Sequence, residues 1–127
     1  MKKKLILLFS IIVFFAIILS AIFLLRNRVI IDDDVDLYYY GGERITVIDD
    51  SQDINIDAKT AISIAKSVIK AYYRESILLH GPYHIYLDPE TRLYYITADG
   101  FLFFHASCFI VINQRNGAII SVAHGKA

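Results

Sequence analysis

The sequence predicts an α+β domain carried on an N-terminal transmembrane helix. Three observations predict it: an uncharged apolar run over residues 5–25, an amphipathic helical pattern that begins at Asp57, and short β-like segments that follow this helix. A helix followed by strands with short connections favours one long helix packed on an antiparallel sheet of about four strands. The predicted organisation is an anchor over residues 1–28, an acidic segment over residues 29–56 and the α+β domain over residues 57–127.

The apolar run is long enough to cross a membrane. It contains about twenty residues, which at about 1.5 Å per residue match the roughly 30 Å hydrocarbon core of a bilayer. The three lysines at residues 2–4 and the amino terminus outweigh Arg26 and Arg28, and positive charge favours the cytoplasmic side. We therefore expect a single-pass protein of the inner (cytoplasmic) membrane, with its C-terminal domain outside the cytoplasm.

A cleaved signal peptide is the alternative for this segment. Leu19-Ser20-Ala21 offers a cleavage site. The apolar run continues past that site, however, and is longer than the roughly 7–15 residues of a signal-peptide core, which favours an uncleaved anchor. Cys108 is the only cysteine of the sequence, so the segment has no site for a lipid anchor and the chain cannot form an intramolecular disulfide.

The helix of the domain has one apolar face and one cationic face. Asp57 is a good N-cap, and the residues after it repeat at a spacing of three and four. The predicted buried stripe consists of Ala61, Ile62, Ala65, Val68, Ile69, Tyr72 and Tyr73, and the solvent face of Lys59, Ser63, Lys66, Lys70 and Arg74. Gly81-Pro82 cannot continue a helix, so we expect the helix to end within residues 76–80.

Four β-like segments follow the helix. They comprise residues 83–87, 93–98, 101–113 and 118–124, separated by turn residues at 88–90, 99–100 and 115–117. The last break contains Asn116-Gly117, a strong hairpin signal because both residues adopt positive φ at low cost. Short connections of this kind predict antiparallel pairing of successive strands.

Several short motifs of this block occur in a characteristic order. They are Thr60-Ala61-Ile62 and residues 64–68 in the helix, Gly81-Pro82-Tyr83 at the entry to the sheet, an aromatic residue at Tyr94 or Tyr95, Asn116-Gly117 with residues 118–120, and the closing His124-Gly125-Lys126. In these motifs, over residues 57–126, the chain resembles the bacterial NTF2-fold immunity proteins. A full NTF2-like cone usually carries several helices, so the resemblance implies a shortened NTF2-like or cystatin-like fold.

The resemblance implies a role in bacterial competition. Members of the family are non-catalytic proteins that bind and neutralise a cognate protein toxin made by the same or a sibling cell, and no cofactor is implied. A domain outside the cytoplasm would suit a toxin that attacks the cell wall or lipid. The alternative is a membrane-tethered module similar to PepSY domains, which also pack a helix on a small sheet, and which would bind a protease or a cell-wall enzyme.

An apolar stretch at residues 101–104, Phe-Leu-Phe-Phe, needs a cover on both faces of its strand. Three covers would serve: the segment 38–48, a second copy of the chain, or a partner. A partner would use the aromatic side chains as anchors, and acidic side chains would speed the capture of a basic toxin. The candidate partner-binding residues are Phe101, Phe103, Phe104, His105, Tyr38, Tyr39, Asp34 and Asp36.

The acidic segment has two interpretations. Residues 27–57 hold nine acidic residues against Arg28 and Arg44. This composition is typical of a solvated spacer that holds a domain away from a bilayer. Gly41-Gly42 could instead close a hairpin over residues 36–48 that adds an edge to the sheet.

No metal site is predicted from spacing. Asp32, Asp34, Asp36 and Glu43 match four positions of a calcium loop, but Leu37 stands where the sharp turn requires glycine. The histidines His80, His84, His105 and His124 are not spaced as ligands on one element, and no cysteine or carboxylate falls at a ligand interval from them.

Catalysis and nucleic-acid binding are not predicted either. Cys108 lies in a strand pattern in which a small buried thiol is the default, and Ser107 with His105 lacks an orienting acid and a glycine-flanked turn. An enzyme would need a polar pocket that holds His84, His105 or His124 beside a carboxylate. The folded block contains neither a phosphate-binding glycine loop nor a basic patch with interleaved aromatic residues.

Overall fold

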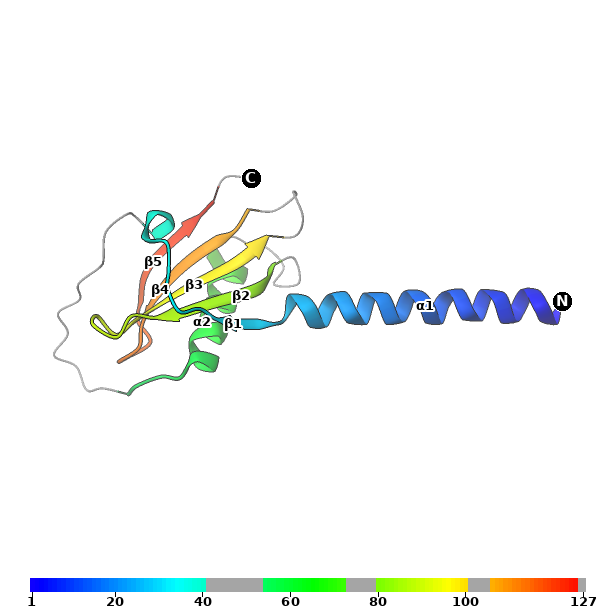
Figure 1. Cartoon of the computed structure of the whole chain (residues 1–127), viewed down its shortest axis with the longest axis horizontal. Helices are drawn as coiled ribbons and strands as arrows, with labels where there is room; N and C mark the ends of the chain where they lie inside the picture. The colour runs from blue at the N-terminus through cyan, green and yellow to red at the C-terminus, as the bar shows by residue number, and fades with distance from the viewer. Residues whose placement is uncertain (41–53, 73–79, 101–105, 126–127) are drawn as a thin grey trace.

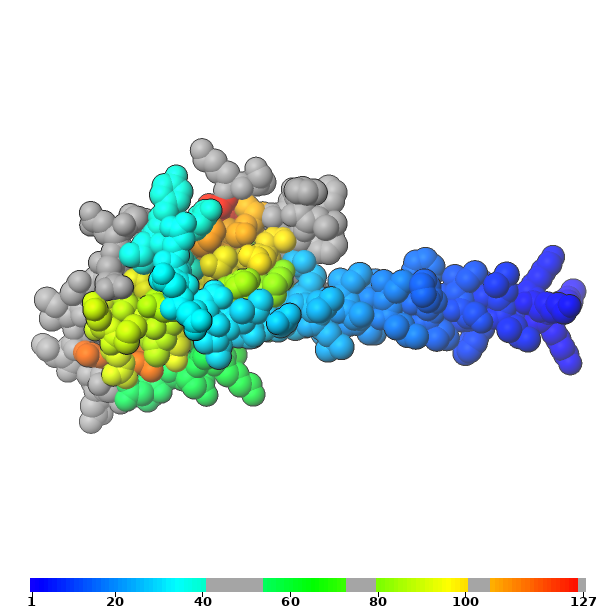
Figure 2. All heavy atoms as spheres, viewed as in Figure 1, coloured from blue at the N-terminus to red at the C-terminus, as the bar shows by residue number. Residues whose placement is uncertain are grey.

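A computed structural model describes residues 1–40, 54–72, 80–100 and 106–125 of the chain. Its N-terminal helix α1 (Lys2–Arg26) projects from an α+β body (Figure 1), and no residue of this helix is buried. In Figure 2 it stands clear of the body along most of its length. α1 is long and apolar enough to cross a membrane, as the sequence predicts.

The body is built on one five-stranded mixed sheet. The strands are β1 (Val29–Ile31), β2 (His80–Leu87), β3 (Leu93–Gly100), β4 (Cys108–Asn113) and β5 (Ile119–His124), and they lie in this order. β2 to β5 form an antiparallel meander, whereas β1 pairs parallel with β2. The prediction of about four antiparallel strands is therefore wrong at one edge, where residues assigned to the acidic segment add a parallel strand.

The predicted helix is present as α2 (Ala58–Tyr72) and packs on one face of the sheet (Figure 1). Its N-cap is confirmed: the carboxylate Oδ1 of Asp57 accepts a hydrogen bond of 2.8 Å from the backbone N–H of Thr60. The buried residues of α2 are Ala61, Ile62, Ala65, Val68 and Ile69.

The predicted stripe is wrong at Tyr72, which is 71% exposed because it lies beyond Ile69, the last residue of α2 in the buried core. Tyr73 and Arg74 lie outside the described residues. So does most of the range 76–80 in which we expect the helix to end, and its last residue, His80, already belongs to β2.

The hairpin predicted at Asn116-Gly117 is confirmed between β4 and β5. Gly117 has a φ of +75°, and its backbone N–H donates to the carbonyl oxygen of Asn113 over 2.7 Å. The side chain of Asn116 accepts a hydrogen bond from the N–H of Ala118. This tight connection requires a glycine in the left-handed region and an asparagine whose side chain accepts a hydrogen bond from the backbone two residues later.

The two faces of the sheet carry different side chains. The face under α2 is packed mainly with aliphatic residues, such as Ile85, Ile96 and Ile110. The opposite face is partly covered by a short 3₁₀ helix, η1 (Leu37–Tyr40), whose Tyr40 is buried against Tyr95. Residues 29–40 thus contribute a strand and a packed turn to the body. The hairpin expected over residues 36–48 lies largely outside the described residues.

α1 joins the body directly at the edge of the sheet. The backbone N–H of Tyr83 donates to the carbonyl oxygen of Arg28 over 2.8 Å. The peptide bond between Gly81 and Pro82 is cis, and Gly81 has a φ of +135°. A Cβ atom at Gly81 would lie 1.7 Å from the carbonyl oxygen of Arg26, so only glycine allows the end of α1 to approach the strand this closely.

Candidate binding pocket

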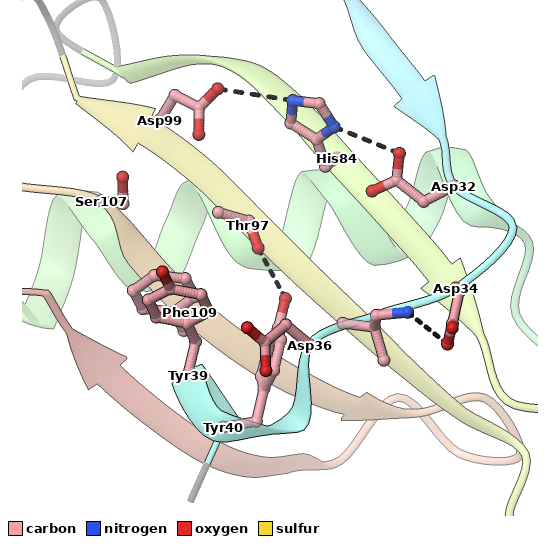
Figure 3. Close-up of a pocket in the computed structure, with 11 residues that line it drawn as sticks. Asp32, Asp34, Asp36, Tyr39, Tyr40, His84, Thr97, Asp99, Ser107 and Phe109 are labelled. Atoms are coloured by element: carbon pink, nitrogen blue, oxygen red, sulfur yellow. Dashed lines mark hydrogen bonds and ion pairs between the residues drawn. The ribbon is translucent and has the colours of Figure 1, made fainter. Parts of the chain in front are cut away.

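An open cavity of about 350 Å³ lies on the η1 face of the sheet (Figure 3). The segment between β1 and η1 forms one side of it, and β2, β3 and β4 form its floor. The lining comprises the acids Asp32, Asp34, Asp36 and Asp99, the rings of Tyr39, Tyr40 and Phe109, and His84, Thr97, Ser107 and Val35. Its volume is at the small end of ligand pockets, which run from roughly 300 to 1,000 Å³.

The acidic segment is held against the sheet by its own side chains and backbone. The N–H of Asp32 donates to the carbonyl oxygen of Ile85 over 2.8 Å and so extends the β1 pairing. The carboxylate of Asp34 accepts from the N–H of Val35, and that of Asp36 accepts from the N–H of Tyr38 at the start of η1. These local bonds fix the turn that places three carboxylates at one side of the cavity.

His84 reaches the cavity because of strand alternation. Its neighbours Tyr83 and Ile85 point into the core under α2, so its own ring points to the opposite face. Thr97 is its cross-strand partner on β3, and Asp99 follows two residues later on the same face. The parallel pairing of β1 with β2 brings Asp32 to the other side of the ring.

The imidazole of His84 lies between two carboxylates (Figure 3). Its Nδ1 is 3.2 Å from Oδ1 of Asp32, and its Nε2 is 3.4 Å from Oδ2 of Asp99. A protonated ring can donate to both carboxylates, whereas a neutral ring can donate to only one. The three side chains are between 31% and 41% exposed, so water reaches this group and weakens the attraction.

The cavity is electronegative. Four carboxylates line it against a single imidazole, and none of the described residues in its lining is lysine or arginine. A concave surface with one sign of charge raises the local concentration of ligands of opposite charge. The lining therefore favours cationic groups.

The aromatic wall of the cavity is ordered by ring contacts. Tyr39 stacks on Phe109 with ring centroids 5.0 Å apart and planes 7° from parallel. Tyr40 meets Phe109 and Tyr95 edge to face. The hydroxyl groups of Tyr40 and Thr97 lie 2.6 Å apart in a hydrogen bond, which ties η1 to β3.

Burial raises the pKa of Tyr40 to about 12, and the nearby carboxylates of Asp32 and Asp99 add to the increase against the opposing effect of the Thr97 hydrogen bond. The hydroxyl therefore stays neutral at physiological pH. Tyr40 contributes a polar but uncharged edge to a pocket whose negative charge comes from the aspartates.

The condition that the sequence sets for an enzyme, a polar pocket with one of three histidines beside a carboxylate, is met at His84. Both ring nitrogens face carboxylates, and the hydroxyl of Thr97 is engaged with Tyr40. Within the described part of the chain, neither nitrogen contacts a hydroxyl or thiol nucleophile, which is the pairing that nucleophilic catalysis requires. Among these residues the ring of His84 is therefore positioned by two carboxylates.

The sequence-predicted partner-binding residues fall into two groups. Asp34, Asp36 and Tyr39 line the cavity, and Tyr38 lies beside them on η1, 80% exposed and in edge contact with Tyr39. The remaining four candidates, Phe101, Phe103, Phe104 and His105, lie outside the described residues, as does Glu43 of the calcium-loop pattern.

The sequence names Asp32 and His84 as candidates for different sites but does not predict that they meet, and it gives no signal for Thr97 and Asp99. His84 lies on β2, Thr97 and Asp99 lie on β3, and Asp32 directly follows β1. The Asp32–His84 contact joins residues 52 positions apart. The alternation of β2 could have assigned His84 to the face away from the helix. Nothing local could have placed Asp32 beside it, because that contact depends on the unexpected parallel strand.

The residues that carry the family resemblance have structural roles in this fold. Gly81 and Pro82 form the junction with α1, and the Tyr94 hydroxyl donates to the carbonyl oxygen of Ile56 ahead of α2. Tyr83 is fully buried in the core under α2. Asn116 and Gly117 form the β4–β5 turn, the N–H of Gly125 donates to the carbonyl oxygen of Ser107, and Lys126 lies outside the described residues.

Comparison of the chain with models of known protein families, with curated proteins and with solved structures finds no match. The fold and the pocket therefore define it: an α+β protein with an N-terminal apolar helix, a five-stranded mixed sheet, a second helix on one face and an acidic, aromatic cavity on the other.

Proposed function

We propose that this protein is a membrane-anchored, non-catalytic immunity protein that neutralises a cognate toxin by receiving a basic side chain of the toxin in the acidic pocket. The observation that carries the proposal is the pocket lining, in which four carboxylates and the stacked pair Tyr39 and Phe109 surround one open cavity. Carboxylates beside an aromatic face are the surroundings that an arginine side chain prefers.

The chemistry of the lining explains how such a partner would be held. A guanidinium group can donate two parallel hydrogen bonds to one carboxylate and lie flat on an exposed ring. Tyr39 is 52% exposed and so offers such a ring at the mouth of the cavity. The excess of negative charge would also accelerate encounter with a basic toxin surface, an effect that falls as the salt concentration rises.

The anchor sets where the toxin is met. With residues 2–4 on the cytoplasmic side, α1 would place the body and its pocket outside the cytoplasm, at the surface of the inner membrane. Because α1 joins the sheet without a long spacer, the pocket would stay close to the bilayer. This position suits a toxin that attacks the cell wall or lipid.

The proposal is tested by co-expression with the protein encoded by the neighbouring open reading frame, where that protein is toxic to the cell. The wild-type chain should restore growth, and the charge-neutralising double variant Asp34→Asn with Asp36→Asn should bind the toxin about tenfold or more weakly and protect less. Asparagine keeps the oxygen that accepts the local backbone hydrogen bonds, so the turn is retained. The matched control is Asp33→Asn, an exposed acid of the same segment that does not line the cavity.

Two results would count against the proposal. If the wild-type chain rescues growth from no linked toxin, the immunity function is rejected. If Asp33→Asn weakens toxin binding as much as the double variant, net charge rather than the pocket is responsible.

A membrane-tethered regulatory module, similar to a PepSY domain, is the second candidate. The observation in its favour is that α2 is the one helix on the sheet face among the described residues, whereas a full NTF2-like cone carries several. In that case the pocket would receive a basic segment of a protease or a cell-wall enzyme. A toxin gene immediately upstream favours the immunity function, whereas a protease or sensor-kinase operon favours the regulatory one.

A further inference from the structure

A second cluster of side chains lies at the end of the sheet that contains Gly81, where α1 joins the body. His80 begins β2, Cys108 begins β4, and His124 ends β5. Because these strands alternate in direction, the three positions meet at the same end, and Cys108 is the register partner of His124. One ligand atom of each side chain lies within 4.8 Å of the other two.

We propose that His80, Cys108 and His124 form a binding site for a divalent transition metal, with zinc as the ion it fits best. The distance between Nε2 of His80 and Sγ of Cys108 is 3.6 Å. A tetrahedral zinc ion, with bonds of about 2.3 Å to sulfur and about 2.0–2.1 Å to nitrogen, holds these two atoms about 3.6 Å apart. Two of the three ligands already have the spacing that the ion requires.

Burial divides the ligands into a buried pair and an exposed third. His80 is 1% and Cys108 0% exposed, so packing holds both side chains in place. His124 is exposed at the end of β5, and its ligand atom lies within 4.8 Å of the other two. Its exposure also provides the route by which an ion would enter from solvent.

The donor set selects the class of metal. Two imidazole nitrogens and one thiolate suit zinc and its neighbours in the first transition row, whereas magnesium and calcium require oxygen ligands. Copper sites of the electron-transfer type use the same three donors in a trigonal arrangement, with a weak axial methionine, glutamine or backbone oxygen. Three protein ligands leave the fourth position of a tetrahedral ion for water or a partner's donor atom.

Binding at this site releases a proton. The thiol of Cys108 loses its proton to solvent, and the resulting thiolate donates an electron pair to the metal, so the affinity should rise with pH. Among the described residues, His80, Cys108 and His124 are the group of three metal-ligating side chains whose donor atoms lie this close together.

The test uses the full chain in detergent micelles, stripped with a chelator and titrated with Co²⁺ as the spectroscopic probe. One Co²⁺ per chain should bind, with a thiolate-to-cobalt charge-transfer band and the intense visible bands of tetrahedral cobalt, and Zn²⁺ should displace it. His124→Ala changes an exposed residue and should lower the affinity tenfold or more. Asp33→Asn is the matched control, at an exposed residue outside both the cluster and the acidic pocket, and should leave the titration unchanged.

A second test of the metal site uses wild-type protein alone. X-ray absorption of the zinc-loaded chain should show one sulfur at about 2.3 Å and nitrogen ligands at about 2.0–2.1 Å. A spectrum without sulfur, a cobalt titration without the charge-transfer band, or binding that His124→Ala weakens no more than Asp33→Asn does would overturn the proposal. In those cases the contact between His80 and Cys108 is a hydrogen bond of the core. The proposal is independent of the toxin-binding function.

Discussion

The two faces of the central sheet differ in what covers them and in what they expose. On one face the 15-residue helix α2 seals a mainly aliphatic core. On the other face the four-residue η1 covers an aromatic cluster only in part and leaves an acidic cavity open beside it. The first face is therefore closed by a helix, whereas the second exposes acidic and aromatic groups to solvent.

The largest expected effect tests the difference between the two faces within a single strand. Ile110 and Val111 are consecutive in β4, both fully buried, and belong to the cores of opposite faces. Ile110→Ala should lower the free energy of unfolding by about 2–5 kcal/mol, since it leaves a cavity in the sealed core. Val111→Ala removes fewer atoms from a face with a thinner cover and should cost less.

The measurement is denaturant unfolding of the full chain in detergent, followed by circular dichroism. Both variants keep the sheet backbone, so each serves as the control for the other. A larger loss for Val111→Ala than for Ile110→Ala would reverse the assignment of the two faces.

Alkaline pH should lower the stability that one tyrosine on each face contributes. Burial raises the pKa of Tyr40, on the η1 face, and of Tyr83, under α2, from 10.0 to about 12. The folded state therefore holds the phenolic protons more tightly than the unfolded state. Each tyrosine contributes stability that is fully present below pH 10 and is lost as the pH rises toward about 12, on the order of 2–3 kcal/mol apiece.

The free energy of unfolding measured against pH tests this expectation. Tyr40→Phe should remove the part of the alkaline loss that belongs to the η1 face, and Tyr83→Phe the part that belongs to the α2 face. A slope between pH 10 and 12 that neither variant changes would contradict it.

The sequence predicted features that depend on neighbours along the chain. The cap at Asp57, the buried residues from Ala61 to Ile69 and the hairpin at Asn116-Gly117 follow from local hydrogen bonding and periodicity, and all three are present. The length and composition of α1 are equally local. The prediction failed at Tyr72 because the periodic pattern continues to residue 72, whereas Ile69 is the last residue of α2 in the buried core.

The sites could not be predicted in the same way. Strand β1 has only three residues and pairs in parallel with a strand that is distant in the sequence. No pattern within β1 therefore predicts the contact between Asp32 and His84. The cluster of His80, Cys108 and His124 likewise depends on strand register rather than on ligand spacing. Spacing arguments apply to ligands on one element, and these ligands come from three.

At neutral pH a smaller effect should follow from loosening η1. Tyr40→Phe removes the hydrogen bond to Thr97 and should lower the free energy of unfolding by about 0.5–1.5 kcal/mol. The matched variant Thr97→Val removes the other partner. A double-mutant cycle isolates the bond: the two losses should be less than additive, and strict additivity would show that the hydroxyl groups do not stabilise η1 on the sheet.

The smallest effect on stability should come from the residues most exposed to a partner. Asp34→Asn leaves the local hydrogen bond to Val35 in place and removes one of four neighbouring negative charges, so the free energy of unfolding should change by no more than about 0.5 kcal/mol. The same change should reduce the salt dependence of association with a basic partner, measured as the association rate at low and high ionic strength. The proposed binding role of the open face requires acidic side chains that change the folding stability little and the association rate strongly. A stability loss equal to that of Tyr40→Phe would show instead that the acids mainly support the fold.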